Sequence, residues 1–223
     1  MDLPMYIVVI INAKVGSDLS SLTHSEDILL NNRQKREWGE KTYPIWLLFN
    51  PKHPAVRHHI WTPILSVIQD NVFRKLRTRI DTSNIYIRYA VSDSGIVPNT
   101  QNWWDTKVDR EINEFRELAD EYEPRLLISF GAFPYEFVRR VYTIKPEKGP
   151  KYWGTTNLGD EFTKSIDNFD INRTNRIPLL RRIVASGKFV EDPFYSENYF
   201  EYAGTKISER IIENKERLDI WME

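Results

Sequence analysis

The segment Asn50-Pro51-Lys52-His53 carries residue types that could do chemistry just after an apolar run. An asparagine amide can position a water molecule but cannot accept its proton, whereas an imidazole can donate a hydrogen bond to a developing anion. Pro51 and Pro54 would stiffen the loop that holds both side chains. Asn50 and His53 are therefore predicted as catalytic residues, with an ordinary loop-capping role for His53 as the alternative.

Arg88 is a second candidate because it lies within Asn84–Val91, a run that is otherwise typical of a buried strand. An unpaired guanidinium is costly to bury, so we expect Arg88 to reach the end of the strand and meet an acid or a phosphate. Asp93 is the carboxylate close to that end. Two interpretations stay open: a structural pair with Asp93, and a side chain that enters a pocket and binds an anionic or carbonyl-rich ligand.

Four short runs of β-branched and aromatic residues predict the buried strands that would position these side chains. They are Met5–Ile11, Pro44–Phe49, Asn84–Val91 and Arg125–Phe130. Helical patterns cover residues 58–79, about 105–122, a stretch that begins near Pro134, and about 197–217. The segment 143–176 is rich in Gly, Pro, Asn and Asp, and it is predicted to be a long irregular excursion.

The alternation of strands and helices predicts the α/β class, as a three-layer α/β/α sandwich with a mostly parallel central sheet. In such sheets ligands bind at the carboxyl edge, where the strands end. Asn50 stands at that predicted edge. A chain of 223 residues with 41% hydrophobic residues can bury one sizeable core, so a single domain is expected.

Charge and composition exclude several classes of protein. The formal net charge is -1, so any nucleic-acid site must depend on a local patch of cations. The chain has no cysteine, which removes disulfides, thiolate metal sites, iron–sulfur clusters and cysteine nucleophiles. No apolar run approaches the ~18 residues of a membrane helix. We expect a soluble, cytoplasmic monomer without membrane contact, metal or cofactor.

The segments after the predicted strands resemble, in order, the motifs of the uracil-DNA glycosylase superfamily. "LFNPKH" is similar to Gly-Gln-Asp-Pro-Tyr-His of the uracil-specific branch, with Asn50, Pro51 and His53 at the Asp, Pro and His. Asn50-Pro51 matches the Gly-x-Asn-Pro-Gly motif of the mismatch-specific and single-strand-selective branches better. Further along, "ILSV" at 64–67 is similar to the family's Phe-Ser-Val.

The resemblance continues to the end of the chain. "NIYIRYAVSD" is similar to Leu-Leu-Leu-Asn-Thr, "NWWDTKVDREI" to Gly-Trp-Glu-x-Phe-Thr-Asp-x-Val-Ile, and "RLLISFGAF" to Val-x-x-Leu-Leu-Trp-Gly. "IPLLRRIVASGKF" resembles the stretch that begins His-Pro-Ser-Pro-Leu-Ser, and "DIWM" resembles the closing Ile-Asp-Trp. Residues 44–223 are therefore predicted to form a uracil-DNA glycosylase-like domain, and residues 1–43 an N-terminal extension packed on it.

The resemblance implies a parallel sheet between helices and cleavage of the N-glycosidic bond of a DNA base. It implies that Asn50 positions water and that His53 and Arg88 contact the base, with Pro51 also lining the substrate site. Leu65 stands where the family has the aromatic ring that stacks on the extruded base, with Trp61 as the alternative for that role. These are the predicted catalytic and substrate-binding positions.

The resemblance places Pro178, Leu179, Leu180, Arg181 and Arg182 in the loop that the family inserts into the minor groove of DNA. An apolar wedge flanked by cations suits the kinking of a duplex and the binding of its phosphates. The same pattern also fits an ordinary strand end that leads into an amphipathic helix. Both interpretations stay open, and DNA is the partner that the first one predicts.

The chain departs from the family at positions that matter for excision. All four histidines lie within the first 59 residues, so Pro178 lacks the histidine that precedes it in the family, and Arg88 replaces the asparagine that reads uracil. The enzyme class is therefore left open between two functions. One is base excision with atypical or lost activity, and the other is a non-catalytic nucleic-acid- or nucleotide-binding protein of the same fold. An unrelated α/β protein is the third alternative.

Overall fold

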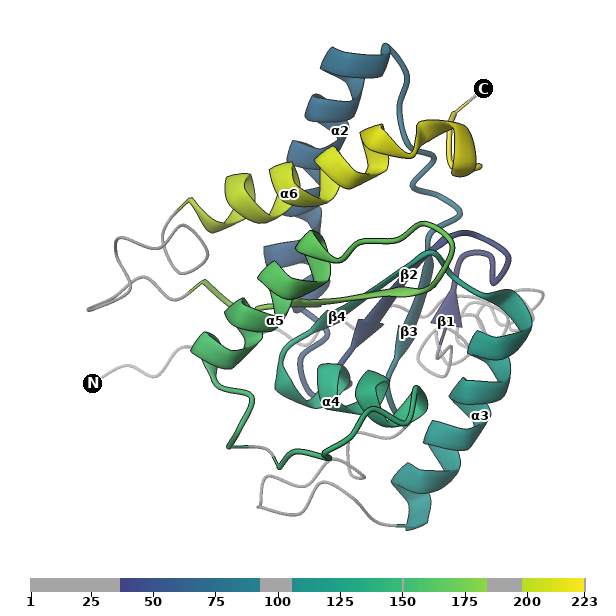
Figure 1. The fold of residues 1–223 in the computed structure, drawn as a ribbon, viewed down its shortest axis with the longest axis vertical. Helices are drawn as coiled ribbons and strands as arrows, with labels where there is room; N and C mark the ends of the chain where they lie inside the picture. Colours follow the sequence, from purple (N-terminus) through teal and green to yellow (C-terminus); the bar gives the residue numbers. More distant parts are fainter. Residues whose placement is uncertain (1–36, 93–105, 150, 184–197, 223) are drawn as a thin grey trace, which may run out of the picture. The chain divides into compact units, whose positions relative to one another are not determined.

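A computed structural model describes residues 37–92, 106–149, 151–183 and 198–222. Its sheet has five strands in the spatial order β1-β3-β2-β4-β5 (Figure 1). The strands are β1 (Glu37–Trp38), β2 (Ile45–Phe49), β3 (Tyr86–Tyr89), β4 (Leu126–Phe130) and β5 (Asn175–Leu179). The four strands from β3 to β5 run parallel, and β1 pairs antiparallel with β3. The predicted α/β class with a mostly parallel sheet is confirmed.

Five α-helices lie within the described ranges, and they alternate with the strands until α4 is followed directly by α5. They are α2 (Thr62–Leu76), α3 (Thr106–Tyr122), α4 (Ala132–Val141), α5 (Thr155–Asp167) and α6 (Tyr199–Glu213). A π-helical turn, η1 (Arg57–Trp61), leads into α2, and a 3-10 turn, η3 (Lys215–Arg217), follows α6. The helices predicted from periodicity at 58–79, 105–122, near Pro134 and 197–217 correspond to α2, α3, α4 and α6.

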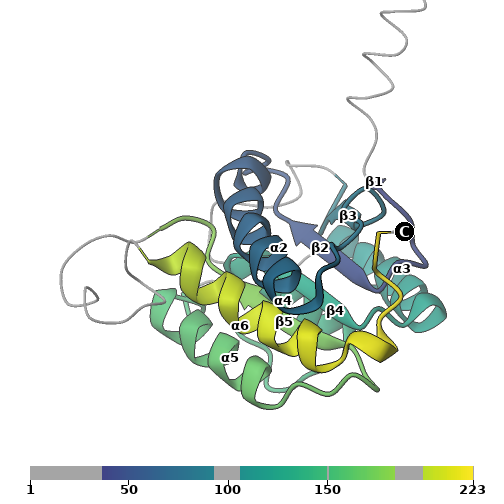
Figure 2. The ribbon, with the colours of Figure 1, turned by 90° about the horizontal axis from the view of Figure 1, so that it is seen from above.

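β2 shows how the sheet buries both of its faces, because all five of its side chains are buried. Ile45, Leu47 and Phe49 belong to a core cluster shared with α2, α5 and α6. Trp46 and Leu48 belong to a second cluster shared with α3 and α4. A parallel sheet that is covered on both faces requires such a continuous apolar strand. Figure 2 shows α2 and α6 packed side by side over the first face.

The segment 143–176 is more regular than its composition predicts, since it contains α5 and the start of β5. α5 buries a narrow apolar stripe, Leu158, Phe162 and Ile166, which is easily missed among its polar residues. β5 contains Pro178, which lacks an amide hydrogen and so argues against a strand in the sequence. The proline is tolerated because β5 lies at the edge of the sheet.

Glu136 of α4 holds the connection between α4 and α5 in place. Its carboxylate is fully buried and accepts hydrogen bonds from Trp153 Nε1 at 2.7 Å and from the amide of Lys148 at 2.8 Å. Arg139 Nη1 lies 2.7 Å from the same carboxylate. A buried carboxylate is stable as an ion when it has a cation and several donors around it. The excursion is therefore fixed against α4 at Lys148 and at Trp153.

The N-terminal predictions fall mostly outside the described residues. The strand predicted at 5–11 and residues 1–36 of the predicted extension lie in that part of the chain. Within the extension, Glu37–Trp38 forms β1, and the amide of Glu40 donates a hydrogen bond to the carbonyl of Asn84 at 3.1 Å. Residues 37–43 are thus part of the sheet-bearing unit.

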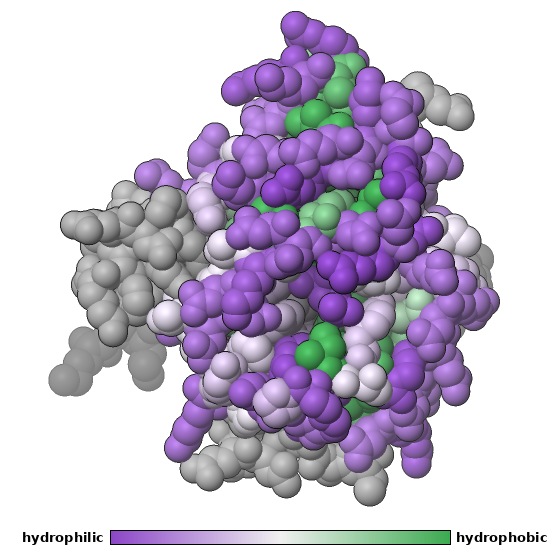
Figure 3. Space-filling model, in the orientation of Figure 1, coloured by the Kyte–Doolittle hydropathy of each residue, from purple (hydrophilic) through white to green (hydrophobic). Residues whose placement is uncertain are grey.

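The described surface is largely polar. Figure 3 shows one face on which hydrophilic side chains dominate and apolar ones form small patches. Among described residues, the large hydrophobic side chains that remain exposed are Phe73, Tyr152 and Met222. None of the helices in these ranges is both long and apolar enough to span a bilayer.

Candidate functional site

The strand order identifies the place where this sheet can bind a ligand. The chain passes from β2 to its neighbour β3 on one side, and then crosses to β4 on the other side of β2. In open α/β sheets the loops that leave two such strands diverge and form a crevice at their carboxyl ends. Here Asn50 follows β2 and Gly131 follows β4, so both lie at this reversal point.

Asn50 is fixed by a turn that it forms itself. Its side-chain oxygen Oδ1 accepts the amide of Lys52 at 2.9 Å, and its backbone carbonyl accepts the amide of His53 at 2.9 Å. Asparagine commonly stabilises turns in this way. Among the described residues no further group bonds this side chain, so the second lone pair of Oδ1 and the donors of Nδ2 can orient a ligand or a water molecule.

His53 contacts Arg181, which follows β5 and is 128 residues away in sequence. The contact joins His53 Nε2 to Arg181 Nη1. A guanidinium only donates hydrogen bonds, so Nε2 is the acceptor and Nδ1 carries the proton. The pKa of His53 is lowered, first by burial and then by the positive charges of Arg181 and Lys52. Because the ordinary value is about 6.5, His53 is neutral at pH 7.

Gly131 brings the third strand end to the same place. Its φ of 89° lies in the left-handed region, which glycine adopts without strain, and its amide donates to the carbonyl of Leu179 at 2.8 Å. A Cβ atom added at Gly131 would lie 3.2 Å from the Cβ of Arg181. The ends of β2, β4 and β5 therefore converge on Arg181.

Arg181 is a half-buried cation, and no carboxylate in the described part of the chain pairs with it. Its pKa is lowered by burial and by the neighbouring charge of Arg182, which is exposed. A guanidinium that meets no acid is free to bind an anion, and its planar donors suit phosphate. Arg181 and Arg182 thus form a local positive patch beside His53.

The sequence around this patch has a charge pattern that the comparison of motifs does not reveal. From residue 50 to residue 69 the chain has no aspartate or glutamate, yet it carries Lys52, Arg57 and three histidines. Arg57, His58 and His59 are exposed on η1. A run of basic side chains without acids indicates an electropositive surface on a protein whose total charge is close to zero.

Arg88 is the residue before the last in β3, where it pairs with Leu48 of β2. It therefore lies one residue short of the carboxyl edge. Its Nη2 is 3.2 Å from Glu111 Oε2 of α3, and its guanidinium lies 5.2 Å from the centre of the Phe115 ring. Glu111 Oε1 also accepts the amide of Ser92 at 2.9 Å. The acid partner that we expected for Arg88 therefore comes from α3, whereas Asp93 falls outside the described residues. Glu111 could have been singled out in the sequence as a candidate partner, because it is a glutamate on the apolar stripe of α3.

The apolar members of the predicted site lie in the core. Leu65 packs against the core from α2, and Pro178 is buried within β5. Leu179 is the last residue of β5 and is 0% exposed, while Leu180 is 3% exposed. Tyr199 Oη accepts the amide of Leu180 at 2.9 Å. The structure thus places both leucines in the core and not on an exposed loop, so a wedge role would require the end of β5 to open.

The described residues contain no group of three or more histidine, aspartate or glutamate side chains arranged to hold a metal ion. No protein-family model matches the chain, and a search of the curated proteins returned no match. The site is therefore defined by geometry alone: Asn50, His53, Gly131 and Arg181 meet at the reversal point, Arg182 lies beside them, and Arg88 is held by Glu111.

Proposed function

We propose that this chain is a uracil-DNA glycosylase-like protein that binds nucleic acid at the carboxyl edge of its sheet, with base excision weak or lost. The observation that supports binding is the contact between His53 and Arg181 beside Gly131. It joins three strand ends at the point where ligands bind in open α/β sheets. The ordered motifs and the parallel sheet between helices support the choice of family.

The charges at this edge suit a phosphate backbone. Arg181 and Arg182 supply two cations, and the segment 50–69 adds others without any acid. Affinity for DNA depends on such local cations and not on the total charge, because each one displaces counterions from phosphates. The Nδ1–H of His53 and the amide of Asn50 are donors for the carbonyl oxygens of a base.

Several features favour binding over excision. Hydrolysis of a glycosidic bond is helped by a group that accepts a proton from water. The amide of Asn50 cannot accept that proton, and Nε2 of His53 faces a guanidinium. Glu111 is engaged by Arg88 and by the amide of Ser92. Excision remains the second candidate function, supported by the Asn50-Pro51-x-His53 motif.

A salt titration tests the binding proposal. The affinity of labelled single-stranded and duplex DNA is measured by fluorescence anisotropy at several salt concentrations. We expect binding to weaken with salt, and Arg181→Ala with Arg182→Ala to flatten the slope of log K against log salt by roughly 2. Arg74→Ala with Lys75→Ala is the matched control, because these exposed cations lie in the last turn of α2, far along the chain from this edge.

The control pair should leave the slope unchanged. An equal loss in both double variants, or no binding of either DNA at low salt, would contradict the proposal. A separate assay with uracil-containing oligonucleotides tests excision: we expect little or no product. Rapid product formation that Asn50→Ala abolishes would establish the catalytic alternative instead.

A further inference from the structure

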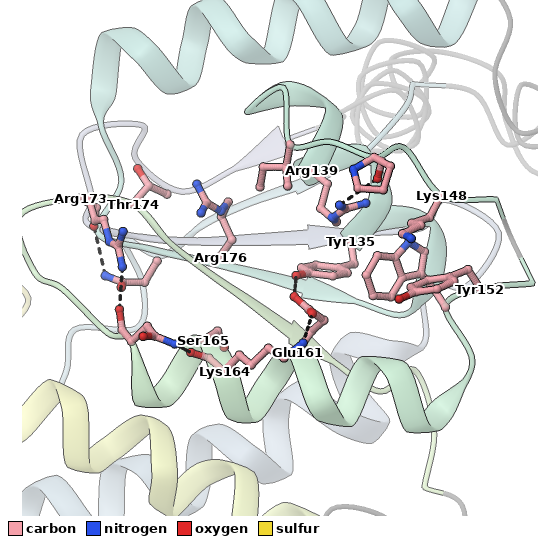
Figure 4. A pocket seen from close by; sticks show the side chains of 15 residues that line it. Tyr135, Arg139, Lys148, Tyr152, Glu161, Lys164, Ser165, Arg173, Thr174 and Arg176 are labelled. Carbon is pink, nitrogen blue, oxygen red and sulfur yellow. Dashed lines mark hydrogen bonds and ion pairs between the residues drawn. The ribbon is translucent and has the colours of Figure 1, made fainter.

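A cleft of about 440 Å³ lies between α4, α5 and the start of β5, apart from the carboxyl edge. α4 contributes Tyr135 and Arg139, α5 contributes Glu161 and Lys164, and β5 contributes Arg176. Figure 4 shows these side chains around the cleft, with Arg173 at one end and Lys148 and Tyr152 at the other. Its volume falls in the range of sites for small molecules, about 300–1,000 Å³.

The walls of the cleft are strongly positive for a protein of net charge -1. Five cations and a single carboxylate, Glu161, line it, and the cations are Arg139, Lys148, Lys164, Arg173 and Arg176. Glu161 is already neutralised, since Lys164 Nζ lies 2.9 Å from it and Tyr135 Oη donates to it at 2.9 Å. The carboxylate of the buried Glu136 pairs with Arg139 and neutralises its charge. Arg173 also has an acid partner, since its Nε lies 3.9 Å from Asp170 Oδ2. Arg176 and Lys148, together with the loosely paired Arg173, therefore set the charge of the cleft.

Arg176 gives the strongest indication that the cleft binds a ligand. It is partly buried, and among the described residues it makes no ion pair or hydrogen bond; its contact is with the Tyr142 ring, whose centre is 5.1 Å from its Cζ. Burial lowers the pKa of Arg176, and the charges of Arg173 and Arg139 act in the same direction. A cation held away from water without an acid is costly, and a bound anion would remove that cost.

The cleft is elongated, and its two ends offer different groups to a ligand. Glu161, Lys164, Ser165 and Asn168 recur at helical spacing along its floor, so it follows α5 for about 10 Å. Arg173 and Arg176 lie toward one end (Figure 4). At the other end Tyr152 is 43% exposed, with Lys148 Nζ 4.1 Å from the centre of its ring. One end thus offers guanidinium donors and the other an accessible aromatic ring.

We propose that this cleft binds a small phosphorylated aromatic ligand of nucleotide size, with its phosphate on Arg176 and Arg173 and its ring against Tyr152. Guanidinium groups bind phosphate through paired donors, and aromatic side chains stack on bases. The short length of the cleft and the partial burial of Arg176 favour a small molecule over a continuous nucleic-acid strand. The proposal is independent of nucleic-acid binding at the carboxyl edge.

Calorimetric titration of the full chain tests the proposal with four probes: AMP, ADP, inorganic pyrophosphate and adenosine. We expect AMP and ADP to bind, pyrophosphate to bind more weakly, and adenosine to bind at least tenfold more weakly than AMP because it lacks the phosphate. Arg176→Met should weaken AMP binding about tenfold, since a charge-assisted hydrogen bond of typical strength is lost. Tyr152→Ala should weaken AMP but leave pyrophosphate unchanged.

Arg181→Ala with Arg182→Ala is the control that separates the two sites, and it should retain AMP binding. Thermal melting gives a second readout: Arg176→Met should not lower the melting temperature without ligand, because the change removes a charge without an acid partner. If that variant fails to fold, Arg173→Met replaces it, because it removes the second guanidinium assigned to the phosphate and should likewise weaken AMP binding. Equal binding of AMP and adenosine, AMP binding unaffected by Arg176→Met, AMP binding lost only in the Arg181 and Arg182 variant, or no binding of any probe overturns the proposal.

Discussion

The contact between His53 and Arg181 determines which ring nitrogen of His53 carries the proton. The sequence predicts His53 and the pair Arg181 and Arg182 as separate candidates, one for the base and the other for DNA. Their contact follows from the fold, because parallel strands bring their carboxyl ends to one edge. Glu111 stands out in the sequence as an acid on the apolar stripe of α3, but its pairing with Arg88 depends on how α3 packs against β3.

The pKa of His53 provides the first prediction. It is lowered by burial and then by the charges of Arg181 and Lys52, so an NMR titration of the imidazole should give a value below 6.5. Arg181→Ala should raise it. Because the unfolded chain binds this proton at higher pH than the folded one, the folded state loses stability as pH falls from 6.5 through the lower folded pKa. A folded value at or above 6.5 would contradict the arrangement.

The pair of Arg88 and Glu111 provides a prediction about stability. Both residues are buried, so Glu111→Ala leaves a guanidinium without its carboxylate and should lower the free energy of unfolding by roughly 3–5 kcal/mol. Arg88→Met combined with Glu111→Leu should recover most of the loss, since an apolar pair needs no partner. Urea denaturation measures both. A loss below about 1 kcal/mol in the single variant would show that water or another group replaces the carboxylate.

At the scale of secondary-structure elements, the sequence predicts the strands that a continuous apolar pattern identifies. The runs at 44–49, 84–91 and 125–130 correspond to β2, β3 and β4, because strands buried on both faces are continuously apolar. α5 was missed because it buries only a narrow apolar stripe. The end of β5 was predicted only as one of two open interpretations, a strand end against an inserted loop, because Pro178 is acceptable only at an edge that the sequence does not reveal. For the same reason, the sequence does not reveal that Leu179 and Leu180 are buried in the core.

The packing of α2 against α6 provides a prediction at this scale. Gly204 of α6 lies so close to α2 that an added Cβ would be 2.7 Å from Val67 Cβ and 2.9 Å from the Ile64 carbonyl oxygen. Alanine is favoured over glycine in helices by about 1 kcal/mol. The backbone oxygen cannot move aside, so overpacking should prevail and Gly204→Ala should destabilise the fold by roughly 1–2 kcal/mol.

Gly149→Ala is the control for this substitution, because no atom lies within 4 Å of the added Cβ. Its effect on the free energy of unfolding should stay within about 0.5 kcal/mol. Thermal and urea unfolding of the two variants give the comparison. A neutral or stabilising Gly204→Ala would mean that α2 and α6 can separate without loss of packing.

On the scale of the whole molecule, a total charge of -1 conceals two positive regions. One is the edge around Arg181, where the segment 50–69 contains no acid, and the other is the cleft around Arg176. The two arginines belong to the same stretch of chain, because Arg176 lies near the start of β5 and Arg181 just beyond its end. Five residues of largely extended chain, the end of β5 and Leu180, separate their Cα atoms by about 16 Å at a rise of about 3.3 Å per residue.

This separation predicts that the two regions act independently. Free-energy effects at sites more than about 7–10 Å apart, with no shared partners, usually add. The affinity of labelled duplex DNA should therefore change by less than about twofold when AMP saturates the cleft, and Arg176→Met should leave DNA binding unchanged. Anisotropy titrations with and without AMP measure the first effect, and the Arg176→Met variant measures the second. A decrease of more than about fivefold with AMP would mean that nucleotide and DNA compete at the carboxyl edge, or that β5 transmits a change between its two ends.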